Sequence, residues 1–512
     1  MTAPRMEGLR IPIHSRFKVE IDRERCKICK RCTVNCTFDA MRFNGERIVP
    51  EHDNCVACQR CAMMCPQDAI TIVENPMTLA PHAAYDDRIR RIGWEQASTG
   101  GVLLSSCGND LPYRSVFDDL VLDAAQVTNP AIDPLREPIE TRSYLGRKPS
   151  RLEFEETDDE MVLKTRLPPN IQLNTPIMVG HMSLGSISYN AQIALFKAAR
   201  MVGTLVGTGE GGLHPDFYEW GDVINSEVAS GRFGINPPYL KKVSALEIKI
   251  GQGAKPGHGG HLPGEKVSDL ISETRMIPKG TDALSPYPHH DIYSIEDLQQ
   301  LIFALKEASR YRVPVGVKIA AVHNSAAIAS GMVRAGADFI TIDGFRGGTG
   351  ATPRIIRDHA GIPIEMAIAT VDQRLREEGI RHKATLCVGG SIRYAADLVK
   401  ALALGADVAM VCTPVLIAMG CRVCQQCHRG QCAWGIATQD PAASQRIDVE
   451  TTARRIANLF HAWNEELREI CGAMGIDSVE SFVGNRDRLR YVGPNPKVAD
   501  ILGVKHAGEA WG

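Results

Sequence analysis

The chain has 512 residues, 44% of them hydrophobic, with 58 Lys and Arg residues against 60 Asp and Glu residues. This length allows roughly three domains of about 150 residues each, and the apolar fraction suffices for large buried cores. The formal net charge of -2 argues against nucleic acid or an anionic membrane surface as the main partner.

The chain starts without the apolar stretch of a signal peptide. Its longest apolar run, 398–421, is interrupted by Lys400, Asp407 and Pro414, so we expect no membrane span. These features predict a cytoplasmic protein. In that compartment cysteines are expected to be reduced or metal-bound, not paired in disulfides.

Two cysteine runs with the spacing C-x2-C-x2-C-x3-C lie near the N-terminus. This tandem is typical of a ferredoxin module with two [4Fe–4S] clusters, in which the fourth cysteine of each run serves the other cluster. The first predicted ligand set is therefore Cys26, Cys29, Cys32 and Cys65. The second is Cys55, Cys58, Cys61 and Cys36. The alternative is structural zinc, since C-x2-C pairs also bind zinc.

Short β-rich stretches, FKVEID and AITIVE, lie before the first run and after the second. We therefore assign residues 1–80 to an α+β ferredoxin-like domain that depends on its clusters for folding. Residues 81–170 are interpreted as a linker and a lead-in to the next domain, with helix-like segments such as VFDDLVLDAAQ.

Between residues 171 and 445, short apolar runs alternate with amphipathic segments. Eight runs are the clearest: IMVGHMSLG, TLVGTGEGG, LEIKIGQGAK, DALSPYP, PVGVKIAAV, ADFITIDG, ATLCVGG and ADVAMVCTP. Segments such as SYNAQIALFKAARMVG and SAAIASGMVRAG suit helices. Buried parallel strands alternating with helices over about 250 residues predict an α/β protein with a (β/α)8 TIM barrel. Residues 446–512 are predicted to be a helical C-terminal segment.

Three loops in this domain attract attention. GTGEGG matches the dinucleotide fingerprint, but LHPDFYEWG follows where a helix should open, so we interpret it as a barrel loop that presents Glu210. The block from Lys249 to His261 is polar and glycine-dense, and a lysine there could clamp a carboxylate together with Arg275. Residues 289–291 resemble a metal triad, but adjacent residues do not readily converge on one ion.

Glycines also follow two later strand-like runs. These glycines are GGTGA at 347–351 and the pair Gly389-Gly390, and by our count the pair ends strand seven. Barrels favour phosphate sites after strands seven and eight, although tight turns without a ligand are the alternative. Iron–sulfur clusters pass single electrons, whereas most organic substrates need two. A flavin with one phosphate, FMN, would connect the two processes.

A third cysteine group has the spacing C-x2-C-x2-C-x4-C. Its members are Cys421, Cys424, Cys427 and Cys432. Four thiolates could bind [4Fe–4S] and three could bind [3Fe–4S], with a zinc knuckle as the alternative. The remaining cysteines, Cys107, Cys387, Cys412 and Cys471, are interpreted as core residues.

Several segments between 178 and 441 together resemble the synthase part of glutamate synthase, in its short archaeal-type form with a fused ferredoxin module. They are MSLGSIS, GTGEGG, KIGQGAKPGHGGHLPG, SPYPHHDIYSIEDL, VGVKI, GFRGGTGATP, VGG and CHRGQCAWGIATQDP. This family's barrel binds FMN and reduces 2-iminoglutarate, formed from 2-oxoglutarate and ammonia, to L-glutamate. The resemblance implies the same activity here.

The resemblance also implies roles for individual residues. The implied substrate-site residues are Glu210, Gln252, Lys255 and Arg275, of which Lys255 and Arg275 would hold the dicarboxylate. The implied FMN contacts are Ser183, Lys318, Gly347, Gly348, Thr349, Gly350, Gly389 and Gly390. Lys318 would lie near the flavin N1 edge. Cys421, Cys427 and Cys432 match the family's [3Fe–4S] ligands, and Cys424 is an addition.

Longer glutamate synthases begin with a cysteine nucleophile that releases ammonia from glutamine, whereas Met1 is followed here by Thr2. We therefore expect free ammonia or a separate glutaminase subunit. Electrons are expected from an NAD(P)H-dependent flavoprotein reductase subunit or a ferredoxin, since no NAD(P) fold is recognised. Three alternatives remain: an N-methylglutamate synthase-type subunit, an electron-transfer subunit without its own substrate, and a zinc-stapled interaction protein.

Overall fold

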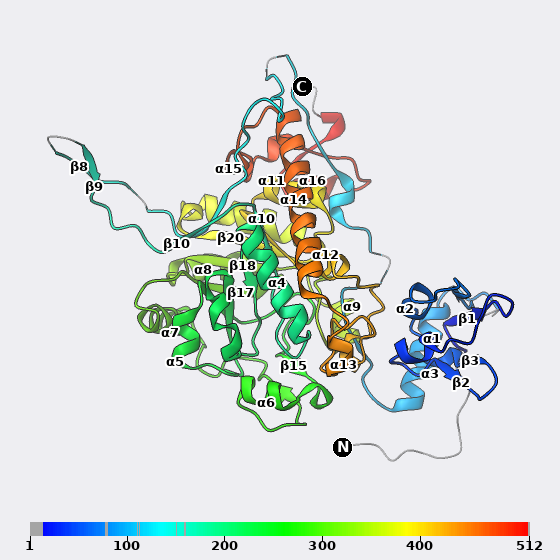
Figure 1. The fold of residues 1–512 in the computed structure, drawn as a ribbon. Helices are drawn as coiled ribbons and strands as arrows, with labels where there is room; N and C mark the ends of the chain where they lie inside the picture. Colours follow the sequence, from blue (N-terminus) through cyan, green and yellow to red (C-terminus); the bar gives the residue numbers. More distant parts are fainter. Residues whose placement is uncertain are drawn as a thin grey trace.

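The computed structural model describes residues 14–509 except 77–79, 110, 112, 128, 150 and 158–159. Its centre is a closed barrel of eight parallel strands (Figure 1), which confirms the predicted fold class. In order around the barrel the strands are β11 (Ile177–Val179), β12 (Val206–Gly207), β13 (Ile224–Ala229), β14 (Ala245–Lys249), β17 (Val315–Ala320), β18 (Phe339–Asp343), β20 (Thr385–Gly389) and β21 (Val408–Val411). Because β11 pairs with both β12 and β21, the sheet has no free edge. Residues 1–13, where the sequence lacks a signal-peptide pattern, lie outside the described residues.

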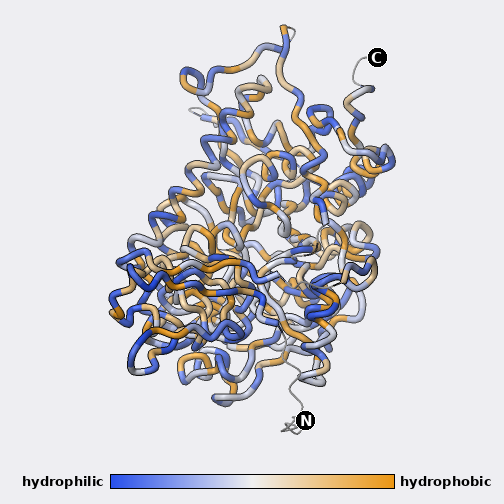
Figure 2. Tube along the Cα trace, turned by 90° about the vertical axis from the view of Figure 1, so that its right-hand side faces the viewer, coloured by the Kyte–Doolittle hydropathy of each residue, from blue (hydrophilic) through white to orange (hydrophobic). Residues whose placement is uncertain are grey.

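Helices surround the barrel and connect its strands. They are α4 (Tyr189–Val202), α5 (Pro237–Lys242), α7 (Ile295–Ala308), α8 (Ser325–Arg334), α10 (Ile364–Glu377), α11 (Ala395–Leu404) and α12 (Thr413–Ala418). The strands are buried on both faces, as expected for a parallel sheet covered by helices. The two helices predicted between strands are confirmed as α4 and α8. Figure 2 shows hydrophobic and hydrophilic stretches alternating along the chain that builds the barrel.

The prediction was wrong at the third barrel strand. The run DALSPYP contains only β16 (Ala283–Leu284), which pairs with β15 (His261–Leu262) outside the barrel. The third strand is instead β13, with the sequence INSEVA. Its buried Glu227 forms an ion pair with Lys318 across the barrel interior. Polar residues paired inside the barrel interrupt the apolar run by which we recognised the other strands.

The N-terminal module is a small α+β unit built from two similar halves. Its strands pair antiparallel as β1 (Phe17–Ile21) with β4 (Ile70–Glu74), and β2 (Met41–Phe43) with β3 (Ile48–Pro50). Each half also has one short helix, α1 (Arg31–Asn35) or α2 (Arg60–Met63), which carries the third cysteine of its run. The buried core of the module is small and includes Val19, Met41 and Ile48. A core of this size is expected to need its metal clusters for stability.

The lead-in wraps around the barrel after α3 (Asp87–Thr99). The strand β5 (Leu104–Ser105) pairs with β19 (Thr352–Pro353) at the carboxyl ends of the barrel strands. The predicted helix in VFDDLVLDAAQ is wrong, because Val116–Asp119 form a 3-10 turn and β6 (Leu120–Leu122) follows. β6 pairs with β22 (Leu489–Tyr491), a partner about 370 residues away that local periodicity cannot reveal.

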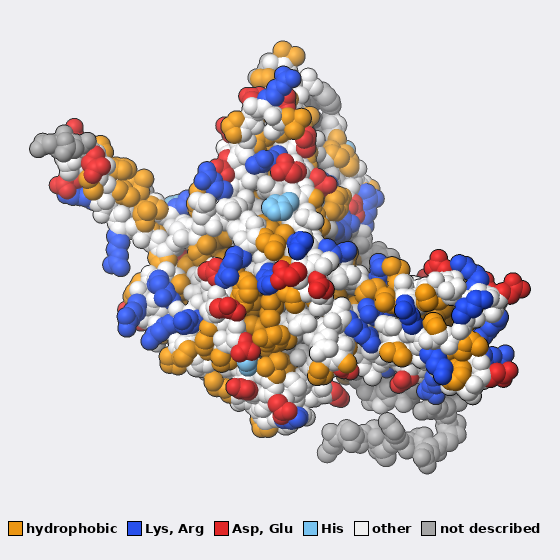
Figure 3. Space-filling view, viewed as in Figure 1, with side chains coloured by type: hydrophobic (Ala, Val, Ile, Leu, Met, Phe, Trp, Pro, Cys, Tyr) orange, Lys and Arg blue, Asp and Glu red, His pale blue; other side chains and the backbone are white. Residues whose placement is uncertain are grey.

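A β-hairpin projects from the body between two strands of the lead-in (Figures 1 and 3). It consists of β8 (Phe154–Glu156) and β9 (Met161–Leu163), and lies between β7 (Ser143–Gly146) and β10 (Asn170–Leu173). Its apolar side chains are exposed, with Phe154 at 52% and Met161 at 60%.

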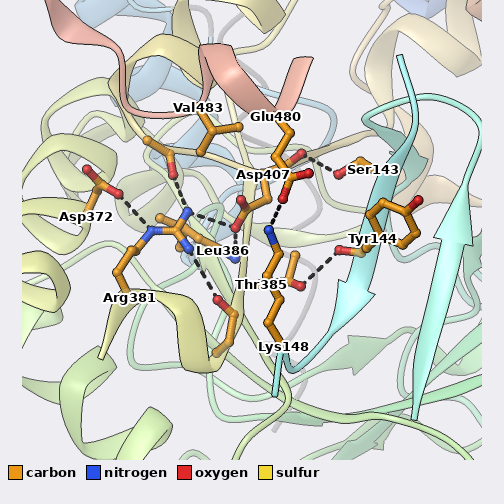
Figure 4. Close-up of polar contacts among 12 residues, drawn as sticks. Ser143, Tyr144, Lys148, Asp372, Arg381, Thr385, Leu386, Asp407, Glu480 and Val483 are labelled. Atoms are coloured by element: carbon orange, nitrogen blue, oxygen red, sulfur yellow. Dashed lines mark hydrogen bonds and ion pairs between the residues drawn. The ribbon is translucent and has the colours of Figure 1, made fainter. Parts of the chain in front are cut away.

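Polar contacts connect the lead-in to the amino-terminal ends of the last two barrel strands (Figure 4). Arg381 donates to Asp372 at 2.7 Å and to Asp407 at 2.8 Å. Thr385 donates from Oγ1 to the Tyr144 carbonyl at 3.0 Å. A cavity of about 500 Å³ lies among these residues, but its lysine and arginines pair with carboxylates within the described residues. This end of the barrel therefore has a structural role, as expected for amino-terminal barrel faces.

The C-terminal segment packs beside the barrel. Its long helix, α14 (Val449–Ala473), packs mainly against α4. It is followed by α15 (Val479–Phe482) and α16 (Pro496–Leu502). The segment also contributes β22 and β23 (Lys505–His506) to a three-stranded sheet with β6, which the helical prediction missed. No helix among the described residues is long and apolar enough to cross a membrane.

Candidate active site and iron–sulfur centres

Loops at the carboxyl ends of the barrel strands enclose two adjoining cavities. We call the first the cation cavity, because its lining includes Lys249, Lys255 and Arg275. We call the second, of about 400 Å³, the glycine cavity, because its lining includes Gly347, Gly348, Gly389 and Gly390. His181 and Gln252 line both, so the two are continuous. Barrel enzymes place their active sites at this end.

The structure brings the predicted site residues to these two cavities. The four predicted substrate-site residues line the cation cavity: Glu210, Gln252, Lys255 and Arg275. Four of the predicted flavin contacts line only the glycine cavity, namely Lys318, Gly347, Gly389 and Gly390. Three line only the cation cavity, namely Ser183, Thr349 and Gly350, and Gly348 lines both cavities.

Two buried cations in the cation cavity lack a carboxylate partner. Arg275 donates to Ser183 Oγ at 3.0 Å, and its Nε has no hydrogen-bond partner. Lys255 Nζ donates to the Ala351 carbonyl at 3.3 Å. Neither side chain forms an ion pair with any residue in the described part of the chain, although Lys249 pairs with Glu210 at 3.0 Å. These two positive charges therefore favour the binding of an anion in the cavity.

The pKa values in the cation cavity follow from this arrangement. Burial, reinforced by the charge of Lys249, lowers the pKa of Lys255 to about 8. Burial lowers the pKa of Arg275 to about 10. Burial alone would raise the pKa of Glu210, but the charges of Lys249 and Lys255 outweigh it and the pKa lies below its usual value. Glu210 is thus an anion at neutral pH.

The glycines of the glycine cavity differ in their surroundings. At Gly390, φ is +93° and an added Cβ would lie 2.7 Å from the Gly344 carbonyl oxygen. At Gly348, the only atom near an added Cβ is Thr413 Oγ1 at 3.4 Å, so the backbone there borders open space. Arg346 and Arg393 also line this cavity. Exposed backbone and guanidinium groups at one wall suit a phosphate.

Lys318 connects the glycine cavity to a buried polar network. Its Nζ lies 2.9 Å from Glu227 Oε1. Burial alone would lower the pKa of Lys318, but the carboxylates of Glu227, Asp343 and Glu247 raise it above its ordinary value. Lys318 therefore stays positively charged beneath the cavity.

Sequence reasoning missed the members of this network other than Lys318, among them His181 and Glu227. His181 Nε2 lies 2.5 Å from Glu247, and His181 lines both cavities. It lies in the quoted run IMVGHMSLG, where a polar residue directly after a strand was the available signal. His181, Glu227 and Glu247 lie close enough to share a metal ion, but Lys318 already supplies a positive charge to Glu227. The triad considered at 289–291 is not formed, because His289 Nε2 contacts the Lys249 carbonyl at 2.7 Å.

The N-terminal cysteines gather in two small cavities in the crossed arrangement that the spacing predicts. One is lined by Cys26, Cys29, Cys32 and Cys65, and we call this the outer set. The other is lined by Cys36, Cys55, Cys58 and Cys61, and we call this the inner set. Four thiols around one small cavity form a donor set that fits a [4Fe–4S] cluster.

The third cysteine group lies at the wall of the cation cavity, and a fifth cysteine joins it. The group comprises Cys421, Cys424, Cys427 and Cys432. Cys107 lines both cavities, and its electrostatic interaction with Cys421 and Cys427, together with burial, raises the pKa of its thiol. Cys107 is buried, as predicted for a core residue, and in addition it lies beside this cysteine group. Cys412, also assigned to the core, likewise lines both cavities.

The inner set faces the third cysteine group across the contact between module and barrel domain. Trp434 Nε1 donates to the Cys58 carbonyl at 2.8 Å, and the Arg60 guanidinium lies over the Trp434 ring at 5.1 Å. Arg446 donates to the carbonyls of Asn35 at 3.3 Å and Val34 at 3.2 Å. In the described chain, no hydrogen bond or ring contact connects residues 22–32 to the barrel domain. The outer set is thus the one farther from the active site.

Comparisons with known proteins found matching families, similar sequences and similar solved structures. A family described as "Conserved region in glutamate synthase" matches residues 112–477, and one described as "4Fe-4S binding domain" matches residues 48–71. The "Archaeal glutamate synthase [NADPH]" of Methanocaldococcus jannaschii is 56% identical over 502 residues, covering 96% of this chain and 98% of that protein. The "Archaeal-type glutamate synthase [NADPH]" of Thermotoga neapolitana is 58% identical over 503 residues, covering 98% of this chain and 99% of that protein. Among solved structures, a flavocytochrome b2 variant with sulfite bound matches 80% of this chain and 90% of its own at 14% identity, with a TM-score of 0.45.

Proposed function

Because the chain belongs to the archaeal-type glutamate synthase family of oxidoreductases, we propose that it forms L-glutamate from 2-oxoglutarate and ammonia through 2-iminoglutarate, with FMN in the glycine cavity. One observation carries the proposal. Two buried cations without carboxylate partners, Lys255 and Arg275, line a cavity that is continuous with the glycine cavity. A dicarboxylate in the first cavity would lie beside a phosphate-bearing cofactor in the second.

The residues of the cation cavity would bind and orient the substrate. Arg275 and Lys255 would each hold one carboxylate of 2-oxoglutarate, which offsets their own desolvation. The anionic Glu210 would stabilise the positive charge of the protonated imine nitrogen. Gln252, which donates to Thr349 Oγ1 at 3.4 Å, would hold the GGTGA loop against the substrate. Holding the imine carbon in a fixed position then supplies proximity, and no covalent catalysis is required.

The glycine cavity fits FMN through its closely packed glycines, the two arginines at its wall and the charge of Lys318. When bound, FMN would supply a hydride to the imine carbon and accept electrons one at a time. Lys318 would stabilise negative charge on the flavin ring, because its neighbours keep it protonated.

We further propose that electrons pass from the outer set to the inner set, then to the third cysteine group and into the active site. Two [4Fe–4S] clusters would be held by the outer and inner sets. The third group would hold a [3Fe–4S] cluster on Cys421, Cys427 and Cys432, or a [4Fe–4S] cluster with Cys424 in addition. The order is supported by the contact of Trp434 with Cys58. A separate NAD(P)H-dependent flavoprotein or a ferredoxin would supply the electrons, and ammonia would come free or from a separate glutaminase.

The purified protein, supplied with a reduced donor, 2-oxoglutarate and ammonium, should oxidise the donor and form one L-glutamate for every two electrons that the donor loses. Donor oxidation without glutamate would refute the proposal and favour an electron-transfer subunit without its own substrate. Replacing ammonium by methylamine distinguishes the proposed activity from an N-methylglutamate synthase-type activity. For the latter, the reaction with methylamine would be faster than the reaction with ammonium.

A further inference from the structure

A solvent-facing segment of the ferredoxin-like module, residues 23–31, concentrates positive charge. Residues 23–31 contain one acidic residue, Glu24, and five basic ones: Arg23, Arg25, Lys27, Lys30 and Arg31. All five basic residues are exposed. We call these five, together with Ile28 in their midst, the basic surface. Figure 3 shows Lys and Arg side chains on the visible face of this module.

These charges are not neutralised by carboxylates of the described chain. In the described part of the chain, no member of the basic surface forms an ion pair. Arg23 donates to the Ile48 carbonyl at 2.8 Å, and Lys30 lies over the Phe43 ring at 3.9 Å, yet both stay exposed. Five cations so close together give this surface a positive potential that attracts a negatively charged partner.

The basic surface covers the outer set. Lys27, Lys30 and Arg31 line the same small cavity as the four cysteines of that set. Cys29 itself is exposed, and Ile28 beside it is 41% exposed. An exposed ligand edge with one apolar side chain, surrounded by cations, has the composition of a transient electron-transfer contact.

The corresponding half of the module provides the contrast. Between Cys55 and Cys61 the only charged residue is Arg60, which packs on Trp434. The charges are therefore not a requirement of the cysteine motif. They occur only where the motif faces solvent.

We propose that the basic surface docks an acidic electron-transfer protein, which delivers single electrons to the outer set. This inference rests on the proposed function, and it specifies the donor. In each encounter the partner is oxidised by one electron and the outer cluster is reduced by one electron. Opposite charges would steer the partner to the exposed edge of the cluster, and Ile28 would provide a small desolvated centre.

The test uses the full-length holoprotein and a small acidic [2Fe–2S] ferredoxin, reduced beforehand, with cluster reduction followed by stopped-flow absorbance. The combined variant Lys27→Glu and Arg31→Glu should lower the second-order rate constant by about 10-fold or more at low salt and flatten its salt dependence. The milder pair Lys27→Gln and Arg31→Gln should fall between this variant and wild type.

The matched control is Lys241→Glu with Lys242→Glu on α5, an exposed pair with the same charge change on the other side of the barrel from the module (Figure 1). It should keep the wild-type rate. Photoreduced deazariboflavin, a small neutral reductant that charge cannot steer, should reduce all variants at nearly the same rate, and iron content should be unchanged.

Three results would overturn the proposal: an unchanged rate in the basic-surface variant, an equal loss in the α5 control, or an equal slowing with deazariboflavin. The last would mean that the charges act on the potential of the cluster alone. Failure of the proposed function is a separate result, since wild type would then form no glutamate even when deazariboflavin reduces it.

Discussion

The two halves of the ferredoxin-like module have nearly the same backbone but different surroundings. Residues between the cysteines adopt matching positive φ values: 52° at both Ile28 and Ala57, and 61° at both Lys30 and Gln59. Yet residues 23–31 of the first half face solvent with cations that form no ion pair in the described part of the chain, whereas Cys58 and Arg60 of the second half contact Trp434 of the barrel domain. The cysteine spacing thus determines the backbone conformation around each cysteine set, and the residues between the cysteines determine whether that set faces solvent or the barrel domain.

The largest effect is expected from removing a ligand of the inner set. Cys58→Ser should lower the rate of glutamate formation with a protein donor by about 100-fold or more. Changing a residue that only supports a metal ligand typically costs about 10- to 100-fold, and loss of the ligand itself should cost at least as much. Cys29→Ser in the outer set should lose activity with the protein donor but keep most of it with deazariboflavin, which can reduce the inner set directly. Cys471→Ser, at a buried cysteine in α14, serves as the control. Equal behaviour of the two ligand variants with both reductants would contradict the order of the sets.

Substrate binding should depend on pH, whereas electron delivery through either half of the module should not. Lys255 has a lowered pKa of about 8, so it is charged below that pH and becomes neutral above it. We expect kcat/KM for 2-oxoglutarate to be flat below about pH 8 and to fall by up to about 10-fold per pH unit above it. Lys255→Arg, which remains charged, should flatten the profile. An unchanged profile in this variant would show that another group titrates.

A smaller effect is expected at the contact that distinguishes the inner half. Trp434→Ala removes the hydrogen bond to the Cys58 carbonyl and the ring beneath Arg60, together about 1–2 kcal/mol. We expect roughly 10-fold slower electron transfer from the inner set to the third group, measured in single-turnover experiments, with unchanged reduction of the outer set. Tyr394→Ala, at an exposed ring that Arg393 covers in a similar way, is the control. A loss of outer-set reduction would contradict the assignment of this contact to the inner half.

The smallest effect is expected at Cys107. Removing the thiol of Cys107, which interacts with Cys421 and Cys427, should shift the reduction potential of the third cluster to more negative values, because polar groups beside cluster sulfurs stabilise the reduced form. Cys107→Ala should do this with unchanged iron content, and Cys107→Ser should shift the potential less. Redox titration followed by electron paramagnetic resonance measures both. Loss of iron in Cys107→Ala would instead identify Cys107 as a ligand.

How far the sequence could predict the fold depended on whether the decisive interactions were local. Strands such as β17 and β20 were recognisable because apolar residues fill both faces. β13 was missed because Glu227 is tolerated only through its ion pair with Lys318, which is 91 residues away. The helix expected in the lead-in failed for the same reason, since β6 is a strand only because β22 lies beside it.

The same distinction applies to the site. Glu210, Lys255 and Arg275 were identified through motifs, and the fold places all three at one cavity. Nothing near Cys107 in the sequence connects it with cysteines more than 300 residues away. Its place follows from β5 pairing with β19, which carries the adjoining loop to the cation cavity.

The sequence by itself determined that this protein has three cysteine groups and a parallel α/β barrel, because ligand spacing and strand hydrophobicity are local properties of the chain. It also determined the family, through motifs that lie in loops after the strands. Only the tertiary structure decided which cysteine set faces the barrel and which faces solvent with unpaired charge. Those facts depend on contacts between residues hundreds of positions apart, and no local pattern encodes them.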